Sequence, residues 1–174
     1  MPPCASHHLR IDLDRQQLTL LTGEQTLASW PVSTARNGPG EQIGSGCTPR
    51  GHHRIRLRIG ANAPANTVFI GRRPSGEIWT PELAHRHPER DWILTRILWL
   101  TGSEPGRNRG GQCDTLRRFI YIHGTPDDQP MGTPGSHGCI RMHNHHLIEL
   151  FEQVNNGTPV EIVCGNTAPA KASR

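Results

Sequence analysis

The stretch IHGTPDDQPMGTPGSHGCIRM, from Ile122 to Met142, places a cysteine directly after His137 and Gly138 and a second histidine, His123, at the end of an apolar run. A thiol is a useful nucleophile only when a base and oxyanion donors are held beside it. The Pro- and Gly-rich turn between the two halves lets the chain return, so that Cys139 can face His123. We therefore expect this stretch to carry the chemistry and the rest of the chain to support it.

The pairing of these two side chains suits acyl transfer. His123 would take the thiol proton of Cys139, leaving a thiolate and imidazolium pair that attacks a carbonyl and later protonates the leaving amine. The small residue Gly138 lets backbone N–H groups approach a developing oxyanion, so the N–H groups of Gly138 and Cys139 are candidates for the oxyanion hole. His123 also needs an orienting acceptor. No Asp or Asn is obviously placed for that, and the backbone carbonyl of Gly124 is the candidate.

Length and composition indicate one domain. The chain has 174 residues, of which 33% are hydrophobic, enough to bury a sizeable core. Gly and Pro are frequent and aromatic residues make up only 5%, which favours turns and short strands over long helices. The formal charge of +4 comes from scattered arginines without a basic block, which argues against a nucleic-acid-binding protein and suits an anionic substrate equally well.

The N-terminus and the cysteines bear on location. MPPCASHHLRIDLD contains no apolar stretch long enough for a signal peptide or a membrane span, so we expect a cytoplasmic protein without membrane contact. Five cysteines form no CxxC pair, which favours reduced thiols over a disulfide framework or zinc knuckle. Histidines 52–53, 85, 87, 143 and 145–146 lack a completing carboxylate or cysteine nearby, so we interpret them as solvated surface residues and expect no metal or other cofactor.

Alternation of apolar and polar residues predicts a mostly β domain. Residues 9–32 are expected to form a three-stranded antiparallel meander, and residues 31–51 a long loop of the kind that is often functional. In the next strand, Ile55, Leu57 and Ile59 should share one face, with arginines on the other. After a turn at 74–76 the chain continues in β pattern. The further strands are predicted at residues 53–59, 68–70, 92–100, 119–122 and 160–163. Residues 92–100 could also form a buried helix, but their β-branched and aromatic residues favour the strand.

One main helix is predicted after the cysteine. It should run from His145 to about Asn155, with Asn144 as its N-cap and Gly157 at its end. The strands and this helix together span residues 9–163. We expect residues 1–8 and 164–174 to be short flexible termini.

The pairing of IHGT with SHGCIRM resembles the L,D-transpeptidase (YkuD-type) catalytic domain. The segments PVST (residues 31–34) and TPRG (residues 48–51) also resemble the N-terminal half of that family, so the resemblance covers Leu9 to about Val163. It implies a single-domain, β-sandwich-like fold. It also implies attack on the bond between a meso-diaminopimelate centre and D-Ala in a peptidoglycan stem peptide.

The resemblance assigns roles within the signature. Cys139 would be the nucleophile, His123 the general base and Gly124 the source of the orienting carbonyl. His137, Gly138 and Cys139 would line the oxyanion hole, although the ring of His137 could instead support the turn.

Two further residues of the signature have candidate roles at the substrate. Arg141, two residues after the cysteine, would hold a carboxylate or brace the site with its planar guanidinium. Ser136 is a candidate substrate contact, although a hydrogen bond to the backbone of its own turn is the simpler interpretation.

The acyl acceptor decides the activity. In the expected cytosolic setting, water would resolve the acyl-enzyme, making the chain an L,D-carboxypeptidase of peptidoglycan recycling. With an amine acceptor the same acyl-enzyme would form cross-links or exchange D-amino acids, as an L,D-transpeptidase does. A muropeptide-binding module without turnover is the alternative from another class of protein. An acylating thiol should also be inhibited covalently by carbapenems.

Overall fold

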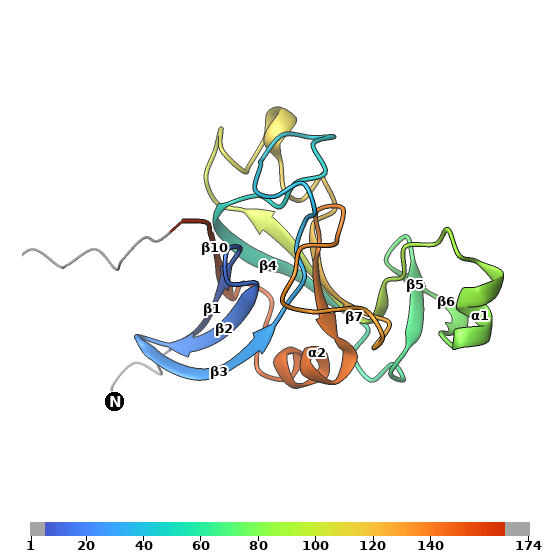
Figure 1. Ribbon diagram of the computed structural model, residues 1–174. Coiled ribbons are helices and arrows are strands. Elements are labelled where there is room, and N and C mark those ends of the chain that lie inside the picture. Colours follow the sequence, from blue (N-terminus) through green and yellow to red (C-terminus); the bar gives the residue numbers. More distant parts are fainter. Residues whose placement is uncertain (1–5, 166–174) are drawn as a thin grey trace, which may run out of the picture.

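The computed structural model describes residues 6–165, and these form a mostly β structure with two short helices (Figure 1). Residues 1–5 and 166–174, which the sequence analysis predicts to be flexible, lie outside the described residues. In chain order the elements are β1 (His7–Asp12), β2 (Gln17–Thr22), β3 (Gln25–Pro31), β4 (Gly51–Ile59), β5 (Thr67–Ile70), β6 (Arg73–Ile78), α1 (Pro81–Arg86), β7 (Leu94–Gly102), the 3-10 turn η1 (Gly111–Cys113), β8 (Tyr121–Thr125), β9 (Ile140–His143), α2 (Asn144–Phe151) and β10 (Pro159–Val163).

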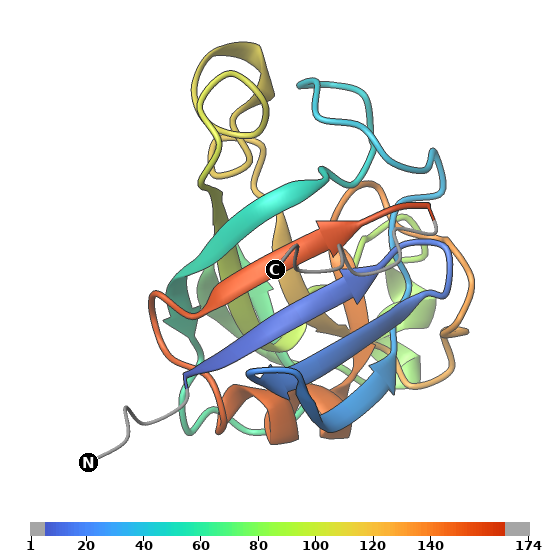
Figure 2. The ribbon, with the colours of Figure 1, turned by 90° about the vertical axis from the view of Figure 1, so that its left-hand side faces the viewer.

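All ten strands belong to one sheet. Its main path runs β3-β2-β1-β10-β4-β7-β5-β6, and β8 pairs with β7 and with β9. Strands β1, β2 and β3 form the predicted antiparallel meander, whereas β1 with β10 and β8 with β9 are parallel pairs. The meander and β10 lie on one side of the molecule, and β5, β6 and α1 project from the other (Figures 1 and 2).

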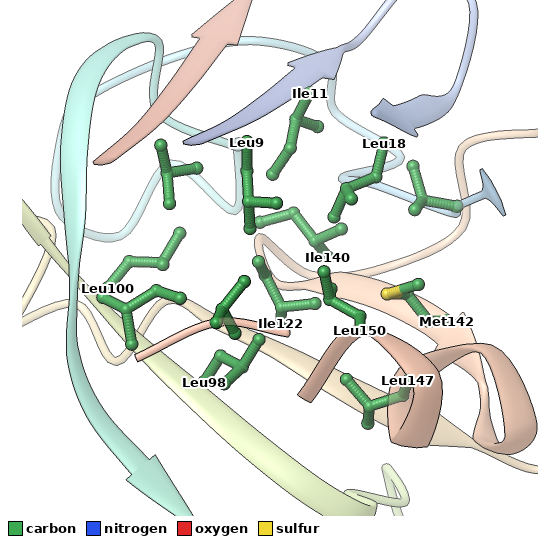
Figure 3. Close-up of a cluster of buried hydrophobic side chains, with 14 of the residues drawn as sticks. Leu9, Ile11, Leu18, Leu98, Leu100, Ile122, Ile140, Met142, Leu147 and Leu150 are labelled. Carbon is green, nitrogen blue, oxygen red and sulfur yellow. The ribbon is translucent and has the colours of Figure 1, made fainter. Parts of the chain in front are cut away.

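The main core lies between the meander and the strand pair β8–β9, closed by α2 (Figure 3). Leu9 and Ile11 of β1 face Ile122 of β8 and Ile140 of β9, and all four are fully buried. The sheet thus curves around a packed apolar interior, which is the sandwich-like arrangement expected from the sequence. Because these side chains occupy alternate positions of their strands, they leave the opposite face of β8 and β9 free for polar residues.

The helices differ from the prediction in two ways. Helix α2 begins at Asn144 itself and ends at Phe151, four residues earlier than predicted, with His143 in the N-cap position. Asn144 does not cap the helix because its side chain is bonded to residues of other elements. Helix α1 was not predicted, although Thr80 caps it by accepting a hydrogen bond from the N–H of Leu83, a signal that the sequence contains.

Several strand boundaries were wrong. Strand β8 begins at Tyr121, because Phe119 has a positive φ of 56° that a strand cannot contain, and His123 lies in the middle of β8. Because β8 lies between β7 and β9, His123 is not at a sheet edge either. A register shift in β4 leaves Leu57 37% exposed, so it does not share the buried face of Ile55.

Two other segments are more regular than predicted. Residues 74–76, where a turn was expected, lie within β6, the second strand of a hairpin with β5. Residues 7–8, expected to be flexible, belong to β1 and pair with β2. Neither helix formed by the described part of the chain has the length and apolar character that crossing a membrane requires.

Candidate active site

Strands β8 and β9 bring the two halves of the signature together. They pair in parallel register, with Ile122 opposite Ile140 and His123 opposite Arg141. Since Ile122 and Ile140 face the core, His123 and Arg141 lie on the other face. Cys139, one residue before β9 begins, falls on that same face. The turn between the strands therefore delivers the cysteine beside the strand that carries the histidine.

The imidazole of His123 is held in one orientation. Its Nδ1 lies 2.7 Å from the carbonyl oxygen of Gly124, and the residue is only 1% exposed. A carbonyl can only accept, so Nδ1 carries the ring proton and Nε2 presents a lone pair. Nε2 has no hydrogen-bond partner among residues 6–165. This is the tautomer that a general base needs.

The thiol of Cys139 is held by backbone groups at the beginning of β8 and just before it. Sγ accepts a hydrogen bond of 3.4 Å from the N–H of Tyr121 and donates one of 3.3 Å to the carbonyl oxygen of Phe119. The residue is partly exposed and packs against a small cluster that includes Tyr121 and Ile97. The thiol proton therefore points to a backbone carbonyl at rest, and rotation about the Cβ–Sγ bond is needed before it can pass to the imidazole.

Burial sets the charge of both groups. It raises the pKa of Cys139 to about 12, with the Tyr121 N–H opposing the shift only in part. Burial also lowers the pKa of His123, against the opposing effects of the Gly124 carbonyl and Asp91. Both groups are therefore neutral near pH 7. The thiolate and imidazolium pair predicted from the sequence would therefore form only as the thiol proton passes to the imidazole, and it stays a prediction.

The SHGC turn is fixed by hydrogen bonds of Ser136 and by a threonine from the long loop. Ser136 is buried, and its hydroxyl donates to the carbonyl of Cys139 at 2.5 Å and accepts the N–H of Gly138 at 3.2 Å. Thr48, in the TPRG segment, donates to the carbonyl of Gly138 at 2.9 Å. The hydroxyl of Ser136 is thus engaged within its own turn, which leaves it little capacity for the predicted substrate contact.

Glycine is required in this turn. Gly138 has a φ of 138°, and a Cβ there would lie 3.2 Å from Cδ1 of Ile120 and 3.3 Å from the carbonyl oxygen of Cys47. Because the Gly138 N–H already bonds Ser136, it does not point to an incoming oxyanion as predicted. The N–H of Cys139 donates to no group among the described residues and is the better donor. Cys47 touches the turn through its backbone.

Arg141 is paired with a carboxylate that the sequence did not indicate. Its Nη2 lies 2.7 Å from Oδ1 of Asp91, and Nδ1 of His137 lies 3.4 Å from Oδ2 of the same carboxylate. Burial tends to raise the pKa of Asp91, but the positive charge of Arg141 and the nearby histidines hold it below its usual value. Arg141 therefore braces the site. The ring of His137 is largely exposed and supports Asp91, in agreement with the alternative that its ring stabilises the turn.

A buried network of hydrogen bonds connects β8, the strand that carries His123, to β7 and α2. Asn144 donates to the carbonyl of Thr125 at 3.0 Å and accepts a hydrogen bond of 2.5 Å from the hydroxyl of Thr95. Thr95 has a φ of 74° and lies at a register shift of β7, opposite Gly124 and His123. A Cβ on Gly124 would collide with the side-chain oxygen of Asn144 and the backbone of Leu94, so only glycine fits.

The remaining histidines do not assemble a metal site. In residues 6–165, no group of three or more His, Cys, Asp or Glu side chains could hold a metal ion. The interpretation of these histidines as solvated is wrong for His53, which is 1% exposed and bonds the carbonyl of Gly51 and the hydroxyl of Thr115, each at 3.0 Å. Burial lowers the pKa of His53 to about 4, so it is a neutral structural residue.

Fold and site together define a class: β-rich domains in which a cysteine and a carbonyl-oriented histidine lie on adjacent parallel strands. Within that class the chain belongs to the YkuD L,D-transpeptidase catalytic domain family, whose model matches residues 6–162. The sequence resemblance is thereby confirmed over nearly the whole chain.

Relatives and solved structures agree with this family. The chain is 31% identical over 117 residues to the probable L,D-transpeptidase YbiS of Escherichia coli, a match that covers 67% of this chain and 37% of that protein. An L,D-transpeptidase from Mycobacterium smegmatis superimposes with a TM-score of 0.56 at 20% identity, covering 91% of this chain and 59% of the other. L,D-transpeptidase 3 from Mycobacterium tuberculosis, in complex with a faropenem-derived adduct, gives a TM-score of 0.56 at 14% identity, covering 90% and 60%. The chain thus spans little more than a third of the curated relative's length.

Proposed function

We propose that this chain is a cysteine-dependent acyl enzyme that attacks the bond between diaminopimelate and D-Ala in peptidoglycan stem peptides. The observation that carries the proposal is the geometry of His123, whose Nδ1 is fixed 2.7 Å from the Gly124 carbonyl. Its Nε2 has no partner among the described residues, and Cys139 directly precedes the neighbouring strand β9. A purely structural histidine would be expected to use both ring nitrogens, as His53 does.

The reaction follows from these positions. The Cys139 thiol adds to the carbonyl carbon as its proton passes to Nε2 of His123, and the N–H of Cys139 faces the developing oxyanion. When the tetrahedral intermediate collapses, the imidazolium of His123 protonates the amine of D-Ala, which leaves. A thioester on Cys139 remains. The acceptor then loses a proton to His123, attacks the thioester and releases the thiol.

Two acceptors are consistent with this acyl-enzyme. The names of the relatives favour an amine, which makes L,D-transpeptidation the first candidate. The partly exposed position of Cys139 would also admit water. Hydrolysis would give the L,D-carboxypeptidase predicted from the sequence, with a cytosolic role in peptidoglycan recycling as the corresponding proposal.

Product analysis separates these outcomes. Purified protein is incubated with a diaminopimelate tetrapeptide, with and without excess acceptor amine, and the products are identified by mass spectrometry. Tripeptide alone means hydrolysis, and a cross-linked or exchanged product means transpeptidation. Release of D-Ala should be insensitive to EDTA and absent in Cys139→Ala. Release that survives in Cys139→Ala would overturn the thiol mechanism.

A covalent inhibitor tests the nucleophile independently. The structure of the L,D-transpeptidase LdtMt1 in complex with imipenem, a carbapenem, supports the expectation that a carbapenem acylates this chain too. Intact-mass analysis after a carbapenem pulse should show one adduct, mapped to Cys139 by peptide digestion. A protein that binds muropeptides without forming an adduct and without releasing D-Ala would be the binding module instead.

A further inference from the structure

Another arginine, Arg72, lies at the tip of the β5–β6 hairpin and contacts residues that hold the cysteine. Gly71 and Arg72 form the turn, with φ values of 56° and 65°. Two positive φ angles are typical of a type I′ turn, whose second position normally holds glycine or asparagine. An arginine in a left-handed conformation is unfavourable for the backbone, which directs attention to what its side chain does.

The side chain of Arg72 lies across aromatic residues that adjoin the thiol. Its guanidinium carbon is 4.8 Å from the ring centroid of Trp99 and 4.9 Å from that of Phe119, and Nη1 donates to the Tyr121 hydroxyl at 3.2 Å. The backbone of Phe119 and that of Tyr121 are the two groups that hold Sγ of Cys139. The cation therefore contacts the same two residues whose backbone groups hold the nucleophile.

Unlike its neighbours in the site, this guanidinium has unused donors. Arg141 is paired with Asp91, and Arg118 donates to four oxygens of the long loop. For Arg72, the Tyr121 hydroxyl is the one hydrogen-bond acceptor within residues 6–165, and no carboxylate of that part of the chain pairs with it. Rings hold the cation in place by cation–π attraction and leave most of its N–H groups for a ligand.

We propose that Arg72 forms a carboxylate subsite that binds a free carboxylate of the acyl donor beside the scissile bond. The inference rests on the proposed function, because a diaminopimelate stem peptide supplies such groups. One is the side-chain carboxylate of diaminopimelate and the other is the terminal carboxylate of D-Ala. The planar guanidinium suits either of them through paired N–H···O bonds.

The hairpin supplies a matched control. Arg73 follows directly, is exposed and makes no ion pair or hydrogen bond through its side chain within the described residues. The test measures kcat and KM for Arg72→Gln, Arg72→Lys and Arg73→Gln with a diaminopimelate tetrapeptide. Arg72→Gln should lower kcat/KM about 10- to 100-fold, mainly through KM, because a charge-assisted hydrogen bond is lost. Arg72→Lys should lose less, and Arg73→Gln should lose less than twofold.

Amidated peptides identify the carboxylate. Two peptides are compared, one amidated at the diaminopimelate side-chain carboxylate and one at the terminal D-Ala carboxylate. On one of them the kcat/KM of wild-type protein should fall by a similar factor. Arg72→Gln should lose nothing further with that peptide. Two results would overturn the subsite. One is that Arg72→Gln lowers kcat/KM by the same factor on the free peptide and on both amidated peptides. The other is that Arg72→Gln has the kinetics of wild-type protein on the free peptide. Equal thermal unfolding midpoints for Arg72→Gln and Arg73→Gln show that the fold is retained, and Arg72→Lys carries the test if they differ.

A binding measurement distinguishes failure of this proposal from failure of the proposed function. Calorimetric titration of the tetrapeptide into Cys139→Ala, with and without Arg72→Gln, measures recognition without turnover. If wild-type protein never releases D-Ala, the proposed function fails, yet weaker binding of the free peptide by the Arg72→Gln protein would still support the subsite. If wild-type protein turns over and Arg72→Gln changes neither binding nor KM, the subsite fails and the function stands.

Discussion

Strands β8–β9, which carry the candidate site, and the hairpin β5–β6, whose tip contacts residues that hold Cys139, are built in opposite ways. Every residue of β8 is buried, whereas β6 is mostly exposed. Arg141 on β9 is paired with Asp91, while Arg72 at the tip of the hairpin lies over aromatic rings and pairs with no carboxylate of residues 6–165. A paired cation holds the protein together, and an unpaired one is available to a ligand. We therefore expect changes in β8–β9 to affect chemistry and stability, and changes in the hairpin to affect recognition.

The largest expected effect is loss of the base on β8. His123→Gln should lower kcat/KM by about 100- to 10,000-fold, because Nε2 of His123 is the base that takes the thiol proton in the proposed reaction. His143→Gln is the matched control on β9, and it should retain activity within a few fold. Steady-state release of D-Ala measures both. Equal losses of kcat/KM in the two variants would mean that His123 is not the base. They would also contradict the expectation that changes in the buried strand β8 have the largest effect on chemistry.

A smaller but still large effect is expected at the turn before β9. Gly138→Ala combines an unfavourable φ with contacts to Ile120 and the Cys47 carbonyl, which should cost about 1–3 kcal/mol of stability and displace the Cys139 N–H. Gly132→Ala is the control, because Gly132 also has a positive φ but open space around it. Thermal unfolding should show a midpoint several degrees lower for Gly138→Ala than for Gly132→Ala. Equal midpoints would mean that the close packing of this turn is unimportant.

The pH profile tests whether the buried pair is neutral at rest. His123 acts as a base only when unprotonated, and burial lowers its pKa, so kcat/KM should rise with pH through a midpoint below 6.5 and then stay level. The Cys139 pKa of about 12 places thiolate formation far above this range. Alkylation by iodoacetamide should accordingly be slow at pH 7 and accelerate up to pH 10. A midpoint above 6.5, or rapid alkylation at pH 6, would support the ion pair instead.

The smallest effect is expected from the carboxylate of Asp91, which pairs with Arg141 of β9 and with His137 of the turn before it. Asp91 raises the pKa of His123, so Asp91→Asn should move the acid limb of kcat/KM to lower pH. Loss of the ion pair with Arg141 should also reduce kcat/KM about tenfold. The pH profile of the variant measures both. An acid limb that moves upward would contradict the assigned sign, and an unchanged profile would make Asp91 a surface residue without influence on β8–β9.

Prediction from sequence succeeded where the contacts are local. The meander of β1 to β3 follows from strict alternation, and the SHGC turn is held by bonds between residues two or three positions apart. It failed where a distant partner changed local geometry. Asn144 is a good N-cap in isolation, but Thr95 and Thr125 engage its side chain, so the helix begins one residue earlier. Phe119 was placed in a strand because its aromatic side chain favours one, although its backbone must turn to reach the thiol.

The sequence by itself determined the family, the nucleophile and base candidates, and the contact of His123 with the carbonyl of the next residue. Such a contact needs only one strand and its own side chain. Only the tertiary structure decided that Asp91 pairs with Arg141, and that Arg72 lies over Trp99 and Phe119. These groups come from separate elements with no shared periodicity, and they meet because β7 pairs with β4 and β5 on one side and with β8 on the other. Charge and desolvation depend on those distant neighbours, so the protonation state of the site could not be obtained from the motif.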